Sequence, residues 1–245
     1  GPGCPLRDLG QVPTDAYPTL EAAVRAVLAA SPPERPVTEA ALAVAGPVSG
    51  DAVALSNHPW SWSVAGLCRT LGLQRLRVLN DFTALALAVP DLPPAALRAV
   101  GGGAACPGSA IAVLGPGTGL GVSGLLPVGG RWVALEGEGG HVTLPATNAR
   151  EAAVLACLAA RYGHVSAERV LSGAGLLALH AALAAVDGER LPAASDPAAL
   201  AAAGIAGTDP RARECIDLFC AWLGTVAGNL ALTLGARGGV YLGGG

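Results

Sequence analysis

The feature that most constrains the fold is a run of apolar segments separated by tight glycine turns over residues 110–136. The segments read AIAVLG, LGVSGLLPV and RWVALEG, and they are joined by PGTG and by Gly129-Gly130. Apolar segments joined by such short glycine turns are typical of β-hairpins. We therefore expect three strands in an antiparallel meander. A meander followed by helices and a further strand indicates a layered α/β protein rather than an all-helical one.

Helical periodicity surrounds this meander. In YPTLEAAVRAVL, apolar residues recur at helical spacing after Thr19, which suits a helix cap. On this pattern we expect helices at 18–30, 64–72, 81–89, 150–161, 166–186 and 211–235. Further strands are expected at 41–48, 75–80 and 238–245. Segment 51–63 is expected to be a strand followed by an irregular loop that holds Trp60 and Trp62.

Three closely spaced prolines interrupt the pattern at Pro90, Pro93 and Pro94. Such clusters stop regular structure and are typical of linkers. We therefore expect a small domain at residues 1–91 and a large domain at 92–245. A chain of 245 residues is long enough for two modest domains with buried cores.

The basic residues exclude several kinds of site. All 15 of them are Arg, because the chain contains no Lys. A Walker P-loop lysine, a Schiff-base lysine and a kinase-type strand lysine are therefore excluded. The net charge is −3 and the charges are scattered, so we expect neither nucleic-acid nor membrane binding. The long uncharged runs are broken by Pro, Gly, Thr and Asn, which argues against a membrane-spanning helix.

The cysteines and the absent methionine indicate where such a chain belongs. Six cysteines are widely spaced with no C-x-x-C pair, so we expect free thiols in a reducing compartment and no protein metal site. The chain contains no Met and begins with Gly1. A primary translation product begins with Met, so we expect an internal fragment of a larger soluble enzyme.

Asn80 and Asp81 come where a strand is expected to end and a helix to begin. Ligands favour this edge of an α/β sheet, and a helix N-terminus favours an ionised carboxylate. Asp81 could therefore accept a proton from a hydroxyl group. The alternative is that the pair only caps the helix, since Asp and Asn are preferred capping residues.

The glycine turn LGPGTGLG (114–121) has three interpretations. Its backbone N–H groups can cradle a phosphate without obstruction by side chains. It can also be a plain hairpin. Gly119-x-Gly121-x-x-Gly124 formally matches the dinucleotide fingerprint, but that motif requires a helix directly after the glycines, where we expect a strand.

Three further segments carry candidate ligands. Glu138 and His141 lie in a glycine-rich loop and could bind hydroxyl groups, although a solvent-exposed loop explains the glycines equally well. Glu168 is expected in the first turns of a helix before a Ser172-Gly173 break, where an acid is usually a surface charge. The final glycines, 243–245, could lie flat against an adenine or ribose or form a simple turn.

Together these segments resemble the bacterial ATP-dependent glucokinase family, the hexokinase-like branch of the actin-type ATPase fold. The resembling stretches occur in family order: YPTLEAAVRAVL, AVAGPVSGD, NHPWSWS, LNDFTALALAVP, GPGTGLGV, WVALEGEGGHV, GHVSAERVLSGAGL and AGNLALTLGARGGVYLGGG. The resemblance implies an α/β protein with the two-domain actin-like ATPase (ribonuclease H-like) fold and a cleft between the domains. The Cys-rich zinc signature of the neighbouring repressor/kinase sugar family is absent.

The resemblance also implies a reaction and its residues. Asp81 is implied as the general base that takes the proton of the glucose 6-hydroxyl when ATP donates its γ-phosphoryl group, the first step of glycolysis. The implied sugar ligands are Asn80, Asp81, Glu138, His141 and Glu168. The implied ATP-binding residues are Gly117, Thr118, Gly119, Gly243, Gly244 and Gly245. The resemblance further implies Mg²⁺, bound through the nucleotide phosphates, and a cytoplasmic enzyme. Members of the family are commonly homodimers.

The chain departs from the family pattern at both ends. Family members open with a strand and an Asp-x-Gly-Gly-Thr-Asn phosphate loop, and nothing like it occurs in residues 1–20. The helices expected after the triple glycine are also missing. An alternative is therefore a catalytically incomplete sugar-binding fragment or pseudokinase. A dinucleotide-dependent oxidoreductase is a third hypothesis, and it requires a helix at about residues 122–134.

Overall fold

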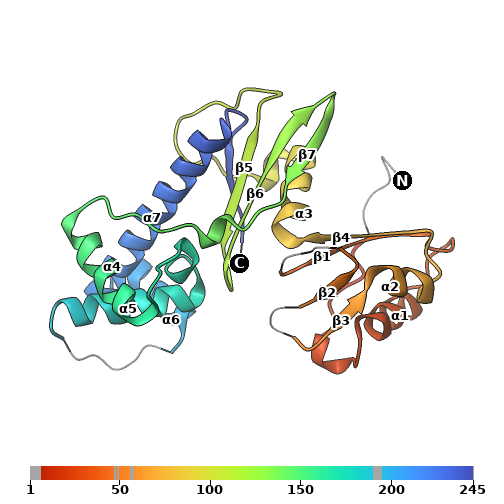
Figure 1. Ribbon diagram of the computed structural model, residues 1–245, viewed down its shortest axis with the longest axis horizontal. Coiled ribbons are helices and arrows are strands. Elements are labelled where there is room, and N and C mark those ends of the chain that lie inside the picture. The colour runs from red at the N-terminus through yellow and green to blue at the C-terminus, as the bar shows by residue number, and fades with distance from the viewer. Residues whose placement is uncertain (1–6, 47, 49, 56–57, 190–194, 245) are drawn as a thin grey trace. The chain divides into compact units, whose positions relative to one another are not determined.

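The computed structural model describes residues 7–46, 48, 50–55, 58–189 and 195–244. The chain divides into two compact units, a first unit of residues 1–81 and a second unit of residues 82–245. Figure 1 shows their helices and strands. The domain boundary that we placed after residue 91 stays a prediction.

The first unit combines two small sheets with two helices. Its elements are η1 (Thr14–Ala16), α1 (Leu20–Ala30), β1 (Glu39–Val44), β2 (Ala52–Ala54), β3 (Ser61–Ser63), α2 (Val64–Thr70) and β4 (Arg75–Asn80). Strands β1 and β4 are parallel, and β2 and β3 are antiparallel. Thr19 caps α1 as expected, because its side chain accepts the Ala22 N–H at 3.2 Å. Our prediction of an irregular loop around Trp62 is wrong, since Trp62 lies in β3 opposite Val53.

The second unit is built on one sheet. It contains α3 (Asp81–Ala88, which begins with the last residue of the first unit), η2 (Val89–Asp91), η3 (Pro94–Ala96), β5 (Ile111–Pro116), β6 (Leu120–Val128), β7 (Arg131–Leu135), η4 (Gly139–His141), α4 (Ala149–Tyr162), η5 (Ala167–Arg169), α5 (Gly173–Val186), α6 (Pro197–Ala206), α7 (Pro210–Leu234) and β8 (Val240–Leu242). The strand order is β7-β6-β5-β8. Strands β5 to β7 form the expected antiparallel meander, and β8 is parallel to β5. Gly129 and Gly130 both have positive φ, as a type I′ hairpin turn requires.

Both faces of β5 are covered by helices, which explains its continuous apolar sequence. Successive strand residues point to opposite faces. Leu114 belongs to a buried cluster formed mainly by helices α4 to α7, whereas Ile111 and Val113 pack with Ala86 of α3. The sheet of the second unit is thus the middle of three layers.

The segment 166–186 is not one helix as we expected. It forms the short helix η5, and α5 begins only at Gly173. The Ser172 side chain accepts the Gly175 N–H at 3.0 Å and caps α5. The Ser172-Gly173 break is therefore a helix start, because a capping serine favours a new N-terminus.

Helix α7 is the one described helix that is long and apolar enough, by length and composition, to cross a membrane. Its side chains Cys215 and Trp222 are fully buried in the larger core cluster. The indole of Trp222 also donates to the Pro145 carbonyl at 2.9 Å. This face of α7 therefore serves as a core element of the second unit.

The described cysteines, Cys68, Cys106, Cys157, Cys215 and Cys220, are free thiols, and Cys4 lies outside the described residues. Burial raises the pKa of the Cys215 thiol to about 12, with a smaller contribution from the negative charge of Glu214. Cys215 is thus held as a protonated core side chain, which suits packing rather than reactivity.

Charged residues join three helices of the second unit. The Arg150 guanidinium in α4 lies 2.6 Å from an Asp187 carboxylate oxygen at the end of α5, and 2.8 Å from a Glu214 oxygen in α7. Hydrogen bonds from Arg150 hold the pKa of Asp187 well below its usual range. The ion pairs therefore fasten the ends of α4, α5 and α7 to one another.

Candidate active site

Asn80 and Asp81 occupy the junction that the sequence predicted. Strand β4 ends at Asn80, which pairs with Val44 of β1, and α3 begins at Asp81. The Asn80 amide donates to the Gly46 carbonyl at 3.3 Å, and Asp81 is exposed. A carboxylate in the first turn of a helix is stabilised by the N-terminal end of the helix dipole. Asp81 is thus an exposed carboxylate at the N-terminal end of α3.

The predicted phosphate turn, residues 117–119, connects β5 to β6. The Gly117 N–H donates to the Gly119 carbonyl at 2.8 Å, which closes a tight turn. Strand β6 follows immediately at Leu120, so the helix that a dinucleotide fingerprint requires is not there. The oxidoreductase hypothesis is therefore wrong in its central structural requirement.

The C-terminal glycines lie beside this turn. Strand β8 runs parallel to β5, and the Gly243 N–H donates to the Leu114 carbonyl at 3.0 Å. A Cβ atom added to Gly244 would lie 2.3 Å from the Pro116 carbonyl oxygen. The two glycine segments predicted to bind ATP are thus neighbours at the same end of β5. Gly245 lies outside the described residues.

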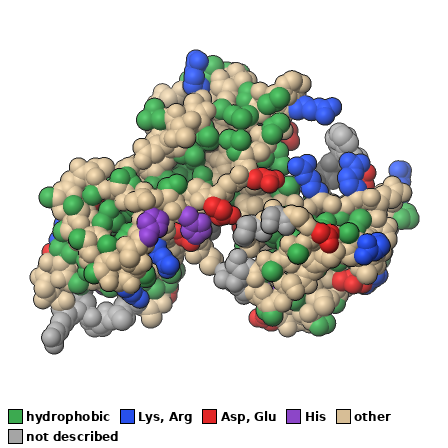
Figure 2. All heavy atoms as spheres, viewed as in Figure 1, with side chains coloured by type: hydrophobic (Ala, Val, Ile, Leu, Met, Phe, Trp, Pro, Cys, Tyr) green, Lys and Arg blue, Asp and Glu red, His purple; other side chains and the backbone are tan. Residues whose placement is uncertain are grey.

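The loop with Glu138 and His141 packs closely on the start of β6. A Cβ atom added to Gly140 would lie 2.2 Å from the Leu120 carbonyl oxygen, so only glycine allows this approach. A carboxylate oxygen of Glu138 lies 3.9 Å from His141 Nε2, and both side chains are about 60% exposed (59% and 60%). Figure 2 shows histidine and acidic side chains lying together on the surface. This pair presents both hydrogen-bond donors and acceptors to solvent.

Glu168 reaches the same point from another segment. It lies in η5 rather than in the long helix that we expected, and it is half-buried. Its Oε2 accepts the Leu120 N–H at 2.9 Å. A backbone pairing brings the two segments together, because the Ala167 N–H donates to the Val142 carbonyl at 2.8 Å. Glu138, His141 and Glu168 are therefore brought together around the start of β6.

Leu120 is the residue that the sequence interpretation missed. Its N–H holds Glu168, its carbonyl lies against Gly140, and its side chain is buried in the larger core cluster. The signal was local: an apolar residue directly after the glycine turn begins a buried strand. The two groups that its backbone contacts, the Glu168 carboxylate and Gly140, lie far along the chain, however, and no spacing rule predicts them.

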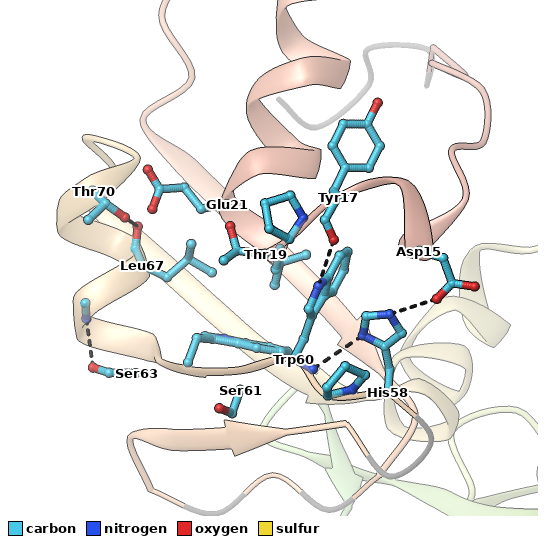
Figure 3. Close-up of a pocket in the computed structure, with 15 residues that line it drawn as sticks. Asp15, Tyr17, Thr19, Glu21, His58, Trp60, Ser61, Ser63, Leu67 and Thr70 are labelled. Atoms are coloured by element: carbon cyan, nitrogen blue, oxygen red, sulfur yellow. Dashed lines mark hydrogen bonds and ion pairs between the residues drawn. The ribbon is translucent and has the colours of Figure 1, made fainter.

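A separate pocket of about 580 Å³ lies in the first unit. His58 pairs with Asp15 at 3.2 Å, and the Trp60 indole donates to the Tyr17 carbonyl at 3.2 Å; both contacts are drawn as dashed lines in Figure 3. The nearby Trp62 indole nitrogen is buried and has no hydrogen-bond partner among the described residues. None of the predicted site residues lines this pocket.

The described residues contain no group of three or more His, Cys, Asp and Glu side chains placed to hold a metal ion. The glycine segments at the end of β5 instead offer backbone groups with little side-chain bulk. Such a surface suits the phosphates and the flat rings of a nucleotide. A metal ion that arrives with nucleotide phosphates would need few ligands from the protein.

Comparisons with known proteins identify the family of this chain. The chain is 52% identical to a glucokinase of Chromobacterium violaceum over 98% of its own length and 68% of the relative's. It is 54% identical to a glucokinase of Aromatoleum aromaticum over 84% of its length and 62% of the relative's. The crystal structure of a glucokinase from an Antarctic psychrotroph matches with a TM-score of 0.85 and 37% identity, over 96% of this chain and 72% of that one.

A second structural likeness bears on the fold alone. The crystal structure of a ROK hexokinase from Thermus thermophilus matches with a TM-score of 0.55 and 24% identity, over 92% of this chain and 67% of that one. With the glucokinase structure it confirms the expected α/β, actin-like ATPase fold.

The family model described as Glucokinase matches residues 5–245. The chain belongs to the glucokinase family.

Proposed function

We propose that this chain carries the transfer of the γ-phosphoryl group of ATP to the 6-hydroxyl of glucose. The observation that carries the proposal is the gathering of Glu138, His141 and Glu168 around Leu120, which directly follows the turn 117–119. Candidate sugar ligands and a candidate phosphate turn thus share one strand end. That is the arrangement that a sugar kinase needs.

The chemistry of the residues suits their roles. Asp81 takes the proton of the sugar 6-hydroxyl as general base, and Asn80, Glu138, His141 and Glu168 bind sugar hydroxyls. Carboxylates accept hydrogen bonds while amide and imidazole groups can also donate, and such a mixture discriminates hydroxyl positions. General bases of this kind typically contribute ~10²–10⁴-fold to a rate.

The donor side relies on backbone groups and a metal ion. Gly117, Thr118 and Gly119 bind the phosphates, and Gly243 to Gly245 border the adenosine. Mg²⁺ accompanies ATP and neutralises phosphate charge, which the chain cannot do with a lysine because it has none. Phosphoryl transfer depends mostly on positioning and charge neutralisation, so few further side chains are needed.

The names of the relatives indicate glucose as the sugar. The curated relatives are named glucokinases, and a glucokinase of Balamuthia mandrillaris with the same fold has been solved in complex with glucose, at 21% identity and a TM-score of 0.67. We place the reaction in the cytoplasm, where free thiols remain reduced.

We also propose that the protein forms a homodimer. Gel filtration with light scattering tests this part of the proposal.

The test is glucose-dependent formation of ADP from MgATP by protein made from the complete open reading frame, with the 245-residue chain in parallel. We expect ADP formation with glucose and none with 6-deoxyglucose, which keeps the ring but lacks the accepting hydroxyl. Glucose binding without ADP formation would instead support a sugar-binding protein or pseudokinase. Equal ADP formation with both sugars would contradict transfer to the 6-hydroxyl.

A further inference from the structure

The segment from Glu168 to Gly173 holds the phosphate turn at both of its ends. The Leu120 N–H, just after the turn, donates to Glu168 Oε2 at 2.9 Å. The Gly173 N–H donates at 3.0 Å to the carbonyl of Gly117, the first residue of the turn. The two residues of the first contact are 48 positions apart in the chain. A distant segment thus supports the turn.

Ser172 joins these two contacts into one structure. Its hydroxyl donates to the Glu168 carbonyl at 2.9 Å and accepts the Gly175 N–H at 3.0 Å. Ser172 is buried, with 5% of its surface exposed. Glu168 and Gly173 are therefore fixed relative to each other by a buried helix cap.

Gly119 shows how closely Glu168 lies against the turn. A Cβ atom added to Gly119 would be 2.4 Å from Glu168 Oε2, whereas one added to Gly117 would meet nothing within 4 Å. Ordinary contacts with a Cβ atom are well above 3 Å, so a side chain at position 119 would displace the carboxylate. The carboxylate is thus part of the packing of the turn.

We propose that Glu168 is a positioning residue for the phosphate turn as well as a ligand of the sugar, so that sugar binding and nucleotide binding are coupled through one carboxylate. The inference rests on the proposed function, which assigns the sugar to Glu168 and the phosphates to the turn. A carboxylate can accept about four hydrogen bonds, enough for Leu120 and a sugar hydroxyl together. Ordering the carboxylate by glucose therefore also orders the turn, and glucose tightens the binding of MgATP.

Two substitutions of Glu168 separate the roles. Glu168→Ala removes the acceptor for Leu120, so we expect the KM for ATP at saturating glucose to rise about tenfold, besides a higher KM for glucose. Glu168→Gln keeps an oxygen that can accept the Leu120 N–H. Its KM for ATP should stay within about twofold of the wild-type value while the KM for glucose rises.

Two kinetic results would overturn the proposal. An unchanged KM for ATP in Glu168→Ala would mean that Glu168 serves the sugar alone. A lowered KM for ATP would mean that the carboxylate mainly repels the phosphates. Because the proposed reaction is tested separately with glucose and 6-deoxyglucose, either result leaves that function standing and removes only the coupling.

Hydrogen exchange of the amides at 117–121, measured without ligands, tests the contact independently of activity. Exchange should accelerate in Glu168→Ala and in Gly119→Ala, and it should stay at the wild-type rate in Glu168→Gln. The matched control is Glu151→Gln, because Glu151 also accepts a backbone N–H in the same unit, that of Thr147 at 2.7 Å, which is not a residue of the turn. It should leave the exchange at 117–121 and the KM for ATP unchanged. Unaltered exchange in folded Glu168→Ala would overturn the positioning role.

Discussion

The two compact units differ in how they support their candidate site residues. Both large clusters of buried side chains that the structure describes lie in the second unit. In the described part of the first unit, the buried hydrophobic residues are Ala23, Val53, Trp60 and Leu67. Glu138, His141 and Glu168 therefore lie around the start of a strand that packs into a large buried core, whereas Asn80 ends the two-stranded sheet β1-β4 and Asp81 begins α3. The candidate ligands around the start of β6 are thus supported by a larger buried core than Asn80 at the end of β4.

The largest expected effect is on the free energy of unfolding, when one tryptophan from each unit is replaced. Trp222 is fully buried and donates to Pro145, whereas Trp60 is 7% exposed, donates to Tyr17 and lines the 580 Å³ pocket. Trp222→Ala should lower the free energy of unfolding by about 3–5 kcal/mol, because it leaves a cavity in a closed core. Trp60→Ala should lower the free energy of unfolding clearly less, since the Trp60 side chain already lines a pocket. Urea denaturation followed by circular dichroism measures both, and an equal or larger loss in Trp60→Ala would break the comparison.

A smaller effect, on the KM for glucose, is expected from the packing of Gly140 on the start of β6. Gly140→Ala places a Cβ atom 2.2 Å from the Leu120 carbonyl oxygen, and backbone cannot yield as a flexible side chain can. The loop should shift, and the KM for glucose should rise about tenfold, the scale of one lost polar contact. The matched control is Gly137→Ala in the same loop, where an added Cβ atom meets nothing within 4 Å. Steady-state kinetics that show the two variants alike would contradict the packing of this loop on Leu120.

The smallest effect concerns the ion pairs between helices. The hydrogen bonds from Arg150 lower the pKa of Asp187 in the folded protein, so this group stabilises the fold above its unfolded pKa of about 3.9. Asp187→Asn should therefore lower the urea midpoint at pH 7. The difference from the wild-type protein should shrink as the pH falls through about 4 towards 2.

The control for this change is Asp217→Asn, since Asp217 forms an exposed pair with Arg213 within α7. Pairs of this kind contribute only about 0.3–0.5 kcal/mol. Its midpoint should hardly move at pH 7. A difference for Asp187→Asn that persists unchanged to pH 2 would show that the side chain stabilises the helices by packing rather than by charge.

Much of the second unit could be predicted because its signals are local. The glycine turns and the apolar runs between them are sufficient to predict the meander β5–β7 and to reject a dinucleotide site after Gly119. Ser172-Gly173 misled the interpretation, because in sequence a capping serine looks the same as an interruption of a helix. Helical spacing around Glu168 likewise did not reveal that the short helix η5 is separate from α5.

The contacts that assemble the candidate site could not be predicted in the same way. Leu120 and Glu168 are 48 positions apart, and their hydrogen bond depends on the pairing of Ala167 with Val142. Such contacts are set by tertiary packing, so they are absent from any local pattern. The resemblance to glucokinases proposed the residues, and the fold explains how those of the second unit meet.

The most direct measurement is the separation of kcat from KM in Asp81→Asn and Glu138→Gln, assayed side by side with glucose and MgATP. If Asp81 is the base, Asp81→Asn lowers kcat by at least about 100-fold and leaves the KM for glucose nearly unchanged. If Glu138 binds the sugar, Glu138→Gln mainly raises that KM. A kcat close to the wild-type value in Asp81→Asn, with the loss appearing only in KM, would contradict the assignment of the base.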